Sequence, residues 1–170
     1  DNGLISPEIN ALEKVYQQLI QVSGRAGRHN NLAKVIIQTR YPDDINLKQI
    51  KTGDYRLISD QCLKVNKELS MPPYSSICIV RAISPKIKGS LDFLNRASLT
   101  LSNKRGISVV GPLPSIPFKI KGNTRNHLVI KSPTKTYLNR VLKFLTKEFD
   151  TWPETKKVKW SYDIDPYDMN

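Results

Sequence analysis

Residues 135–149, KTYLNRVLKFLTKEF, decide the fold, because their apolar side chains recur every three or four positions. Residues at that spacing share one side of a helix, so the stretch predicts an amphipathic helix. Its inward side chains should be Leu138, Val141, Leu142, Leu145 and Phe149. This helix lies between two stretches with strand character, residues 125–131 and residues 158–164.

Upstream of that helix the sequence predicts a strand, a helix and another strand. Residues 76–83 are β-branched and apolar, and residues 90–101 have a helical period. Residues 107–111 favour a strand that Pro112 and Pro114 should end. The whole order is then β-α-β-β-α-β, which favours a ferredoxin-like α+β sandwich of two layers.

The N-terminal part has a different pattern. Ser6-Pro7-Glu8 can start a helix that should run to about residue 22, where Gly24 and Gly27 would end it. Residues 34–39 favour a short buried strand, and residues 54–69 a helix stopped by Pro72 and Pro73. We therefore expect an α/β edge of a lobe over residues 1–53, a linking helix over 54–72, and a C-terminal domain over 73–170.

Composition excludes several classes of protein. Hydrophobic residues make up 39% and charged residues 25%, which is typical of a soluble chain, and no apolar run approaches the roughly 18 residues that span a bilayer. The start lacks a signal sequence and an initiator Met, so we expect an internal cut or a processed product. Cys62 and Cys78 have no other Cys or His at metal-ligand spacing, so the sequence indicates neither a zinc site nor a disulfide framework. This favours a protein of the reducing cytoplasm.

Positive charge is concentrated in the second part of the chain. The net charge is +12; residues 1–53 hold 7 Lys and Arg against 5 Asp and Glu, and residues 54–170 hold 20 against 10. Such an excess favours a polyanionic partner, because phosphate contacts release condensed counterions. The alternative is that the charge serves solubility alone.

Residues 21–28, QVSGRAGR, hold two arginines that each follow a glycine. A guanidinium offers a planar fork of donors to phosphoryl oxygens and can stabilise the charge that develops during hydrolysis. The small residues between them allow a close approach of the backbone. A solvated basic turn is the alternative, since short motifs recur by chance.

Following an amphipathic helix, residues 21–28 resemble motif VI of superfamily 2 helicases. Gln38-Thr39, residues 71–74 (MPPY), 110–114 (VGPLP) and 157–166 narrow the resemblance to the family of primosomal protein N′, the replication-restart DNA helicases. The resemblance implies the edge of a RecA-like lobe, followed by a DNA-binding domain. It also implies that Arg25 and Arg28 are catalytic arginine fingers, and that Gln21 and Gly24 bind nucleotide.

The same resemblance implies an ATP-dependent 3′-5′ helicase that recognises stalled or branched replication forks and initiates primosome assembly. The full-length enzyme would use ATP and Mg²⁺, and the family holds structural zinc whose ligands are absent from this chain. This sequence has no phosphate-binding loop and no Mg²⁺-binding segment, so the chain alone should not hydrolyse ATP. Asp163, Asp165 and Asp168 have the composition of a metal site, but we expect an extended tail and no metal.

Three cations surround a predicted turn at Gly122-Asn123. Lys119, Lys121 and Arg125 suit phosphate contacts of DNA, with a solvated hairpin tip as the alternative. His127 is the one candidate ring for base stacking between residues 119 and 127. Trp160, in the final strand, is interpreted as a core residue.

The partners implied are forked or single-stranded DNA, other primosome proteins and the acidic C-terminal tail of the single-stranded DNA-binding protein, with no membrane. Lys135 and Asn139 share a face at the start of the last helix and match the family's tail-binding positions. An ordinary solvated helix start is the alternative. A second hypothesis for the whole chain is a stand-alone basic nucleic-acid- or ribosome-binding module of ferredoxin-like fold, without ATPase activity.

Overall fold

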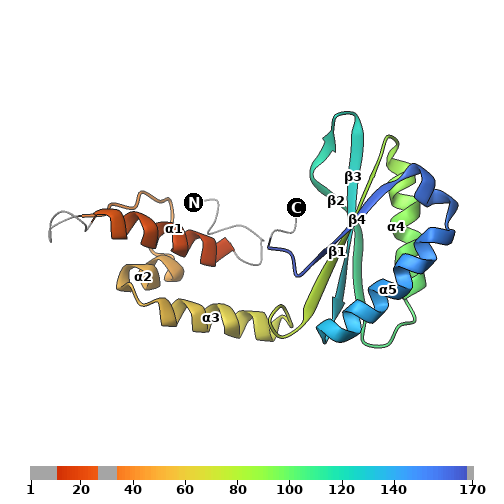
Figure 1. Cartoon of the computed structure of the whole chain (residues 1–170). Coiled ribbons are helices and arrows are strands. Elements are labelled where there is room, and N and C mark those ends of the chain that lie inside the picture. The colour runs from red at the N-terminus through yellow and green to blue at the C-terminus, as the bar shows by residue number, and fades with distance from the viewer. Residues whose placement is uncertain (1–10, 27–33, 168–170) are drawn as a thin grey trace. The chain divides into compact units, whose positions relative to one another are not determined.

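The computed structural model describes residues 11–26 and 34–167, which divide into two compact units, residues 1–68 and residues 69–170 (Figure 1). The first unit is helical among its described residues. The second holds the sheet and two long helices. In the described parts of the chain, no helix is both long and apolar enough to cross a membrane.

The first unit packs three helices, α1 (Ala11–Ala26), α2 (Ile45–Thr52) and α3 (Tyr55–Glu68). The Asp44 carboxylate caps α2 by accepting from the backbone N–H groups of Asn46 and Leu47. Gly53 ends the helix in the left-handed conformation, with φ of 71°. The core of this unit consists of Tyr16, Leu47, Ile50 and Ile58. The predicted helix over residues 54–69 is confirmed as α3, whereas α2 was not predicted.

Two predictions about the first unit are wrong. Residues 34–39 form no strand, and Ile36 is 89% exposed. A strand needs a neighbour for its backbone hydrogen bonds, and the described residues of this unit contain no other strand. Helix α1 also continues through Gly24 to Ala26, since an interior glycine costs only about 0.5–1 kcal/mol. Ser6-Pro7-Glu8 and Gly27 lie outside the described residues.

The second unit has the predicted β-α-β-β-α-β order. Its elements are β1 (Ser76–Ser84), α4 (Ile87–Leu101), β2 (Ser108–Ile120), β3 (Asn123–Ser132), α5 (Lys135–Thr151), the short 3-10 helix η1 (Pro153–Lys157) and β4 (Lys159–Ile164). The sheet order is β2-β3-β1-β4, and every neighbouring pair is antiparallel. This arrangement confirms the ferredoxin-like α+β fold.

Helices α4 and α5 lie side by side on one face of the sheet (Figure 1). All the apolar residues of α5 that the sequence predicted to face inward are buried: Leu138, Val141, Leu142, Leu145 and Phe149. The Trp160 ring packs against Phe149, with centroids 5.0 Å apart, so its interpretation as a core residue is confirmed. The opposite face of the sheet, called the open face below, has no helix of the second unit on it.

Strand β2 does not end at Pro112, as the sequence predicted, but continues to Ile120. Its pairing with β3 is irregular between Val110 and Leu113 and again between Pro114 and Lys119. Proline is tolerated in a strand at a sheet edge, where its missing N–H interrupts no second ladder. Because β2 pairs with β3 alone, the prolines modify the strand without ending it.

Candidate nucleic-acid interface

The second unit carries most of the positive charge. Residues 69–170 hold 17 Lys and Arg against 7 Asp and Glu, a difference of +10 out of the net +12. The first unit is therefore nearly neutral. A polyanion would be attracted to the sheet domain rather than to the helical unit.

The predicted basic hairpin joins β2 to β3 by a two-residue turn, Lys121-Gly122, with Ile120 paired to Asn123. The turn therefore lies one residue earlier than the predicted Gly122-Asn123, because Asn123 already pairs in the ladder. Both turn residues have positive φ, 47° for Lys121 and 81° for Gly122. This is the backbone of a tight hairpin turn whose twist matches that of the strands. The Lys121 side chain is exposed at the tip.

The three predicted DNA-binding cations point in different directions. Lys119 pairs with Thr124, which is buried on the helix side and donates to the Ser84 carbonyl. Arg125 is the next residue along β3, so its side chain projects from the open face. Its guanidinium donates to the Pro117 carbonyl at 3.3 Å. The hairpin therefore presents cations to both of its sides and at its tip, not one compact cluster.

The His127 ring is buried and lies against β2. Its Nδ1 is 3.1 Å from the Ser115 hydroxyl. Burial lowers the pKa of the imidazole, and the charges of Arg81 and Arg125 lower it further. A neutral, buried ring is not available for base stacking. Phe118, which is 39% exposed, was not singled out from the sequence, although it directly precedes the basic run.

The predicted tail-binding residues lie at the start of α5. Asn139 is exposed, one turn after Lys135. The Lys135 ammonium, however, lies 3.0 Å from Oδ2 of Asp165, just after β4. Asp165 also accepts from the Ile77 backbone N–H through Oδ1. Lys135 thus already has an anionic partner within the domain.

The predicted nucleotide-binding and catalytic residues of the first unit lie on α1. Gln21, Gly24 and Arg25 are exposed in its last turns, and Gln21 and Arg25 are one turn apart. A side chain at Gly24 would meet no atom within 4 Å. Arg28 lies outside the described residues.

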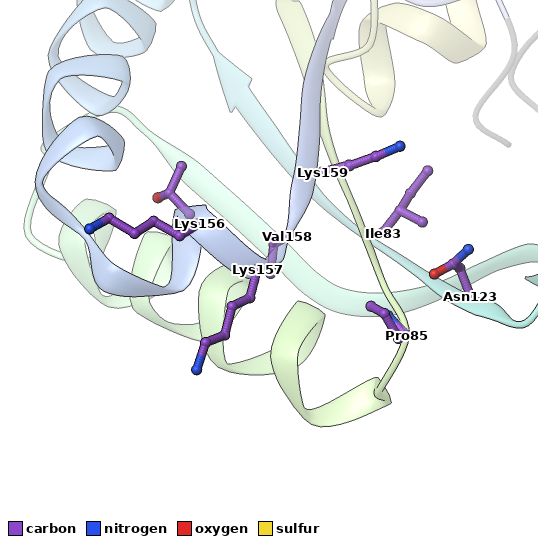
Figure 2. Close-up of a pocket in the computed structure, with 8 residues that line it drawn as sticks. Ile83, Pro85, Asn123, Lys156, Lys157, Val158 and Lys159 are labelled. Atoms are coloured by element: carbon purple, nitrogen blue, oxygen red, sulfur yellow. The ribbon is translucent and has the colours of Figure 1, made fainter.

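A pocket that sequence analysis missed lies where β1 ends and β4 begins. Its volume is about 450 Å³, and it is lined by Ile83, Pro85, Asn123, Thr155, Lys156, Lys157, Val158 and Lys159 (Figure 2). The lysines at 156, 157 and 159 are exposed, whereas Val158 is buried. The run KKVK was a visible signal in the sequence, but nothing in it indicated that Ile83 and Asn123 would lie beside it.

A buried polar network fixes this end of the sheet. The Ser84 hydroxyl accepts from the Ser90 backbone N–H at 2.9 Å, and the Asn126 amide donates to the Ser90 hydroxyl at 2.8 Å. These bonds connect β1, the first turn of α4 and β3. The backbone around Pro85 and Lys86 is therefore held in place beside the pocket.

The aspartates near the C-terminal end form ion pairs. Asp163 lies 2.7 Å from the Arg81 guanidinium, and Asp165 binds Lys135. Within residues 11–26 and 34–167, no three His, Cys, Asp or Glu side chains gather as a metal site would require. Asp168 lies outside the described residues.

Comparison with known proteins identifies the family. Residues 67–167, which include the whole β-α-β-β-α-β unit, match the family model described as the primosomal protein N C-terminal domain. The chain belongs to this family. Proteins named Replication restart protein PriA match most of it: that of Bacillus subtilis is 32% identical over 99% of this chain, and that of Rickettsia felis 31% over 85%. That of Haemophilus influenzae is 26% identical over 100% of the chain.

These matches extend beyond the primosomal protein N C-terminal domain into the helical first unit. They favour the C-terminal part of a replication restart protein over a stand-alone basic module of ferredoxin-like fold. The chain spans about a fifth to a quarter of each relative, namely 21%, 22% and 23% of their lengths.

Proposed function

We propose that this chain is the C-terminal part of an ATP-dependent 3′-5′ DNA helicase that recognises stalled or branched replication forks and initiates primosome assembly in the bacterial cytoplasm. The observation that supports this function best is the match to proteins named replication restart protein PriA over nearly the whole chain. The positive excess of the second unit agrees with a DNA partner.

The second unit is proposed to bind forked and single-stranded DNA through phosphates. Lys119, Lys121 and Arg125 supply cations from the hairpin. Contacts to phosphate carry no sequence information, so binding should show no sequence preference. Titration of a labelled fork and a labelled single strand with this chain should show affinity that falls steeply from about 50 to 200 mM salt. Affinity that does not change over that range would remove the proposal.

The first unit is proposed to contribute to ATP hydrolysis in the full-length enzyme. Gln21 and Gly24 would contact nucleotide, and Arg25 and Arg28 would stabilise the charge on the transferred phosphoryl group. The phosphate-binding loop for ATP and the ligands of Mg²⁺ and of the family's structural zinc would be supplied by the rest of the enzyme. In the full-length helicase, Arg28→Ala should reduce turnover by about 10³-fold or more while nucleotide binding changes little.

Arg56→Ala on α3 is a matched control, since it removes an exposed arginine outside the motif. Turnover within about twofold of wild type in Arg28→Ala would exclude the arginine-finger role. DNA-stimulated ATP hydrolysis by this chain alone would contradict the assignment of the phosphate-binding groups to the rest of the enzyme.

Two kinds of protein partner complete the proposal. Other primosome proteins would assemble on the full-length enzyme. The acidic tail of the single-stranded DNA-binding protein would dock at Lys135 and Asn139, where it must compete with the carboxylate of Asp165. That competition makes the site testable with variants of Asp165.

A further inference from the structure

One row of side chains across the open face has an apolar residue between two cations. Ile83 on β1 pairs with Arg125 on β3 and with Lys159 on β4. Directly paired residues project to the same side of a sheet, so two cations flank one isoleucine. Ile83 and Lys159 also line the pocket at this end of β4.

Further cations surround the same end of the sheet. Lys86 and Lys88 are exposed where β1 turns into α4, and Lys121 is exposed at the hairpin tip, two residues before the pocket residue Asn123. The nearby carboxylate of Glu154 on η1 is paired with Arg96 at 3.1 Å. Asp92 lies one turn after Lys88 on α4, whereas the residues that line the pocket include three lysines and no carboxylate.

The pocket itself combines an apolar wall with a basic rim. Ile83, Pro85 and Val158 supply the apolar surface, and Asn123 and Thr155 supply neutral polar groups. Figure 2 shows that the lysine side chains diverge, with Lys159 directed away from Lys156 and Lys157 on the other side of β4. Because these ammonium groups point apart, they cannot all bind the same phosphate group. They suit successive phosphates of a chain that passes over the pocket.

We propose that this pocket holds one unpaired nucleotide of single-stranded DNA, with its base or sugar against Ile83 and Pro85. The flanking phosphates would contact Lys157 on one side and Lys159 on the other. This inference rests on the proposed DNA binding and adds to it the form of DNA that the domain selects.

The apolar wall is the reason for choosing a single strand. A base in a duplex stacks on its neighbours, so it could enter the pocket only after unpairing, which costs a few kcal/mol. An unpaired base can turn its face to an apolar surface at no such cost. The lysines alone would accept either form, and the wall discriminates between them.

The test uses the whole chain and two fluorescent probes, an oligothymidylate of about 12 nucleotides and a duplex of the same length, with anisotropy followed across salt concentrations. Lys157→Gln combined with Lys159→Gln removes two charges at the pocket. Arg140→Gln combined with Lys143→Gln removes two exposed charges from α5 and is the matched control. Ile83→Asn and Pro85→Ser change the apolar wall, and circular dichroism checks that each variant folds.

The pocket double variant should bind the single strand at least about tenfold more weakly at low salt. The slope of the logarithm of the binding constant against the logarithm of the salt concentration should be shallower by about 1.4, which is about 0.7 for each lost phosphate contact. The α5 control should stay within about threefold of wild type. Folded Ile83→Asn and Pro85→Ser should lose affinity for the single strand several-fold, while duplex affinity changes by less than about twofold.

Equal losses in the pocket and α5 double variants would overturn the proposal. So would equal losses of single-strand and duplex affinity in both wall variants, because the wall would then not discriminate. If wild type binds DNA in a salt-dependent way while these variants match their control, the proposed function stands and the pocket assignment falls. If the wild-type chain binds neither probe, both the proposed DNA binding and the pocket assignment are wrong.

Discussion

Lys135 Nζ and Asp165 Oδ2 lie 3.0 Å apart and join the start of α5 to the residue that follows β4. Asp165 has a positive φ of 49°, its backbone N–H donates to the Ile77 carbonyl at 2.7 Å, and its Oδ1 accepts from the Ile77 N–H. One carboxylate thus fixes the ends of three elements. The ion pair and the backbone bond can be separated by substitution.

Asp165→Asn should lower the free energy of unfolding by no more than about 1 kcal/mol, because it removes a largely exposed ion pair and keeps an acceptor for Ile77. Asparagine also tolerates the left-handed backbone. Asp165→Ala loses both the acceptor for Ile77 and the tolerance of the left-handed backbone, so its free energy of unfolding should fall by about 1–2 kcal/mol more. Urea unfolding measures both values. Equal losses in the two variants would show that the bond to Ile77 contributes nothing.

The same substitution tests the proposed tail site. Asp165→Asn removes the internal competitor of Lys135, so a fluorescent acidic tail peptide should bind several-fold more tightly than to wild type. Lys135→Glu and Asn139→Ala should bind the peptide more weakly. Equal affinity in wild type and all three variants would show that the start of α5 does not bind the tail.

His127 should make stability depend on pH. Burial and the charges of Arg81 and Arg125 lower the pKa of the folded state below the ordinary value of 6.5, so the unfolded chain binds the proton more readily. Stability should be full above pH 6.5 and decline as the pH falls through that value towards the lower folded pKa. Thermal unfolding between about pH 7.5 and 5.5 measures the decline, which His127→Gln should reduce. An identical decline in the variant would assign it to other groups.

Asn126 should be a stabilising residue and not a DNA contact. It is 2% exposed, and its amide donates to the Ser90 hydroxyl. Asn126→Ala leaves a buried hydroxyl without that donor, so the free energy of unfolding should fall by about 1–3 kcal/mol. Asn103→Ala, at an exposed turn after α4, is the control and should stay within about 0.5 kcal/mol. A loss no larger than that of the control would show that the network is not needed for folding.

The sequence predicted the sheet domain well, because its elements carry strong periodic patterns. Helix α5 has a full apolar stripe, and strands β1 and β3 are rich in β-branched residues, so local pattern and tertiary burial agree. The first unit was predicted less well. Helix α2 has only eight residues, too few for a clear period, and residues 34–39 have strand composition without a strand beside them.

The candidate site shows the same division between local and distant information. That Lys119, Lys121 and Arg125 lie on one hairpin could be predicted because they are close in sequence and surround a glycine, while their role in DNA binding stays a prediction. The pocket was missed because Ile83, Asn123 and Lys159 become neighbours only through the pairing of β1 with β4 and β3. The ion pair of Lys135 with Asp165 joins residues 30 positions apart, so no local sequence pattern predicted it either.

Strand β2 forms one margin of the sheet, and Pro112, Pro114 and Pro117 lie along it. Each of these residues lacks the N–H that a strand from another molecule would need as a donor. Sheet extension along this margin is thereby disfavoured wherever one of these prolines faces outward, in a domain that also exposes apolar side chains on β2 such as Ile116. A macromolecule that engages this side must do so through side chains such as Phe118 and Lys119. If the domain binds DNA as proposed, copies that gather on one DNA molecule would not polymerise through β2 at these prolines.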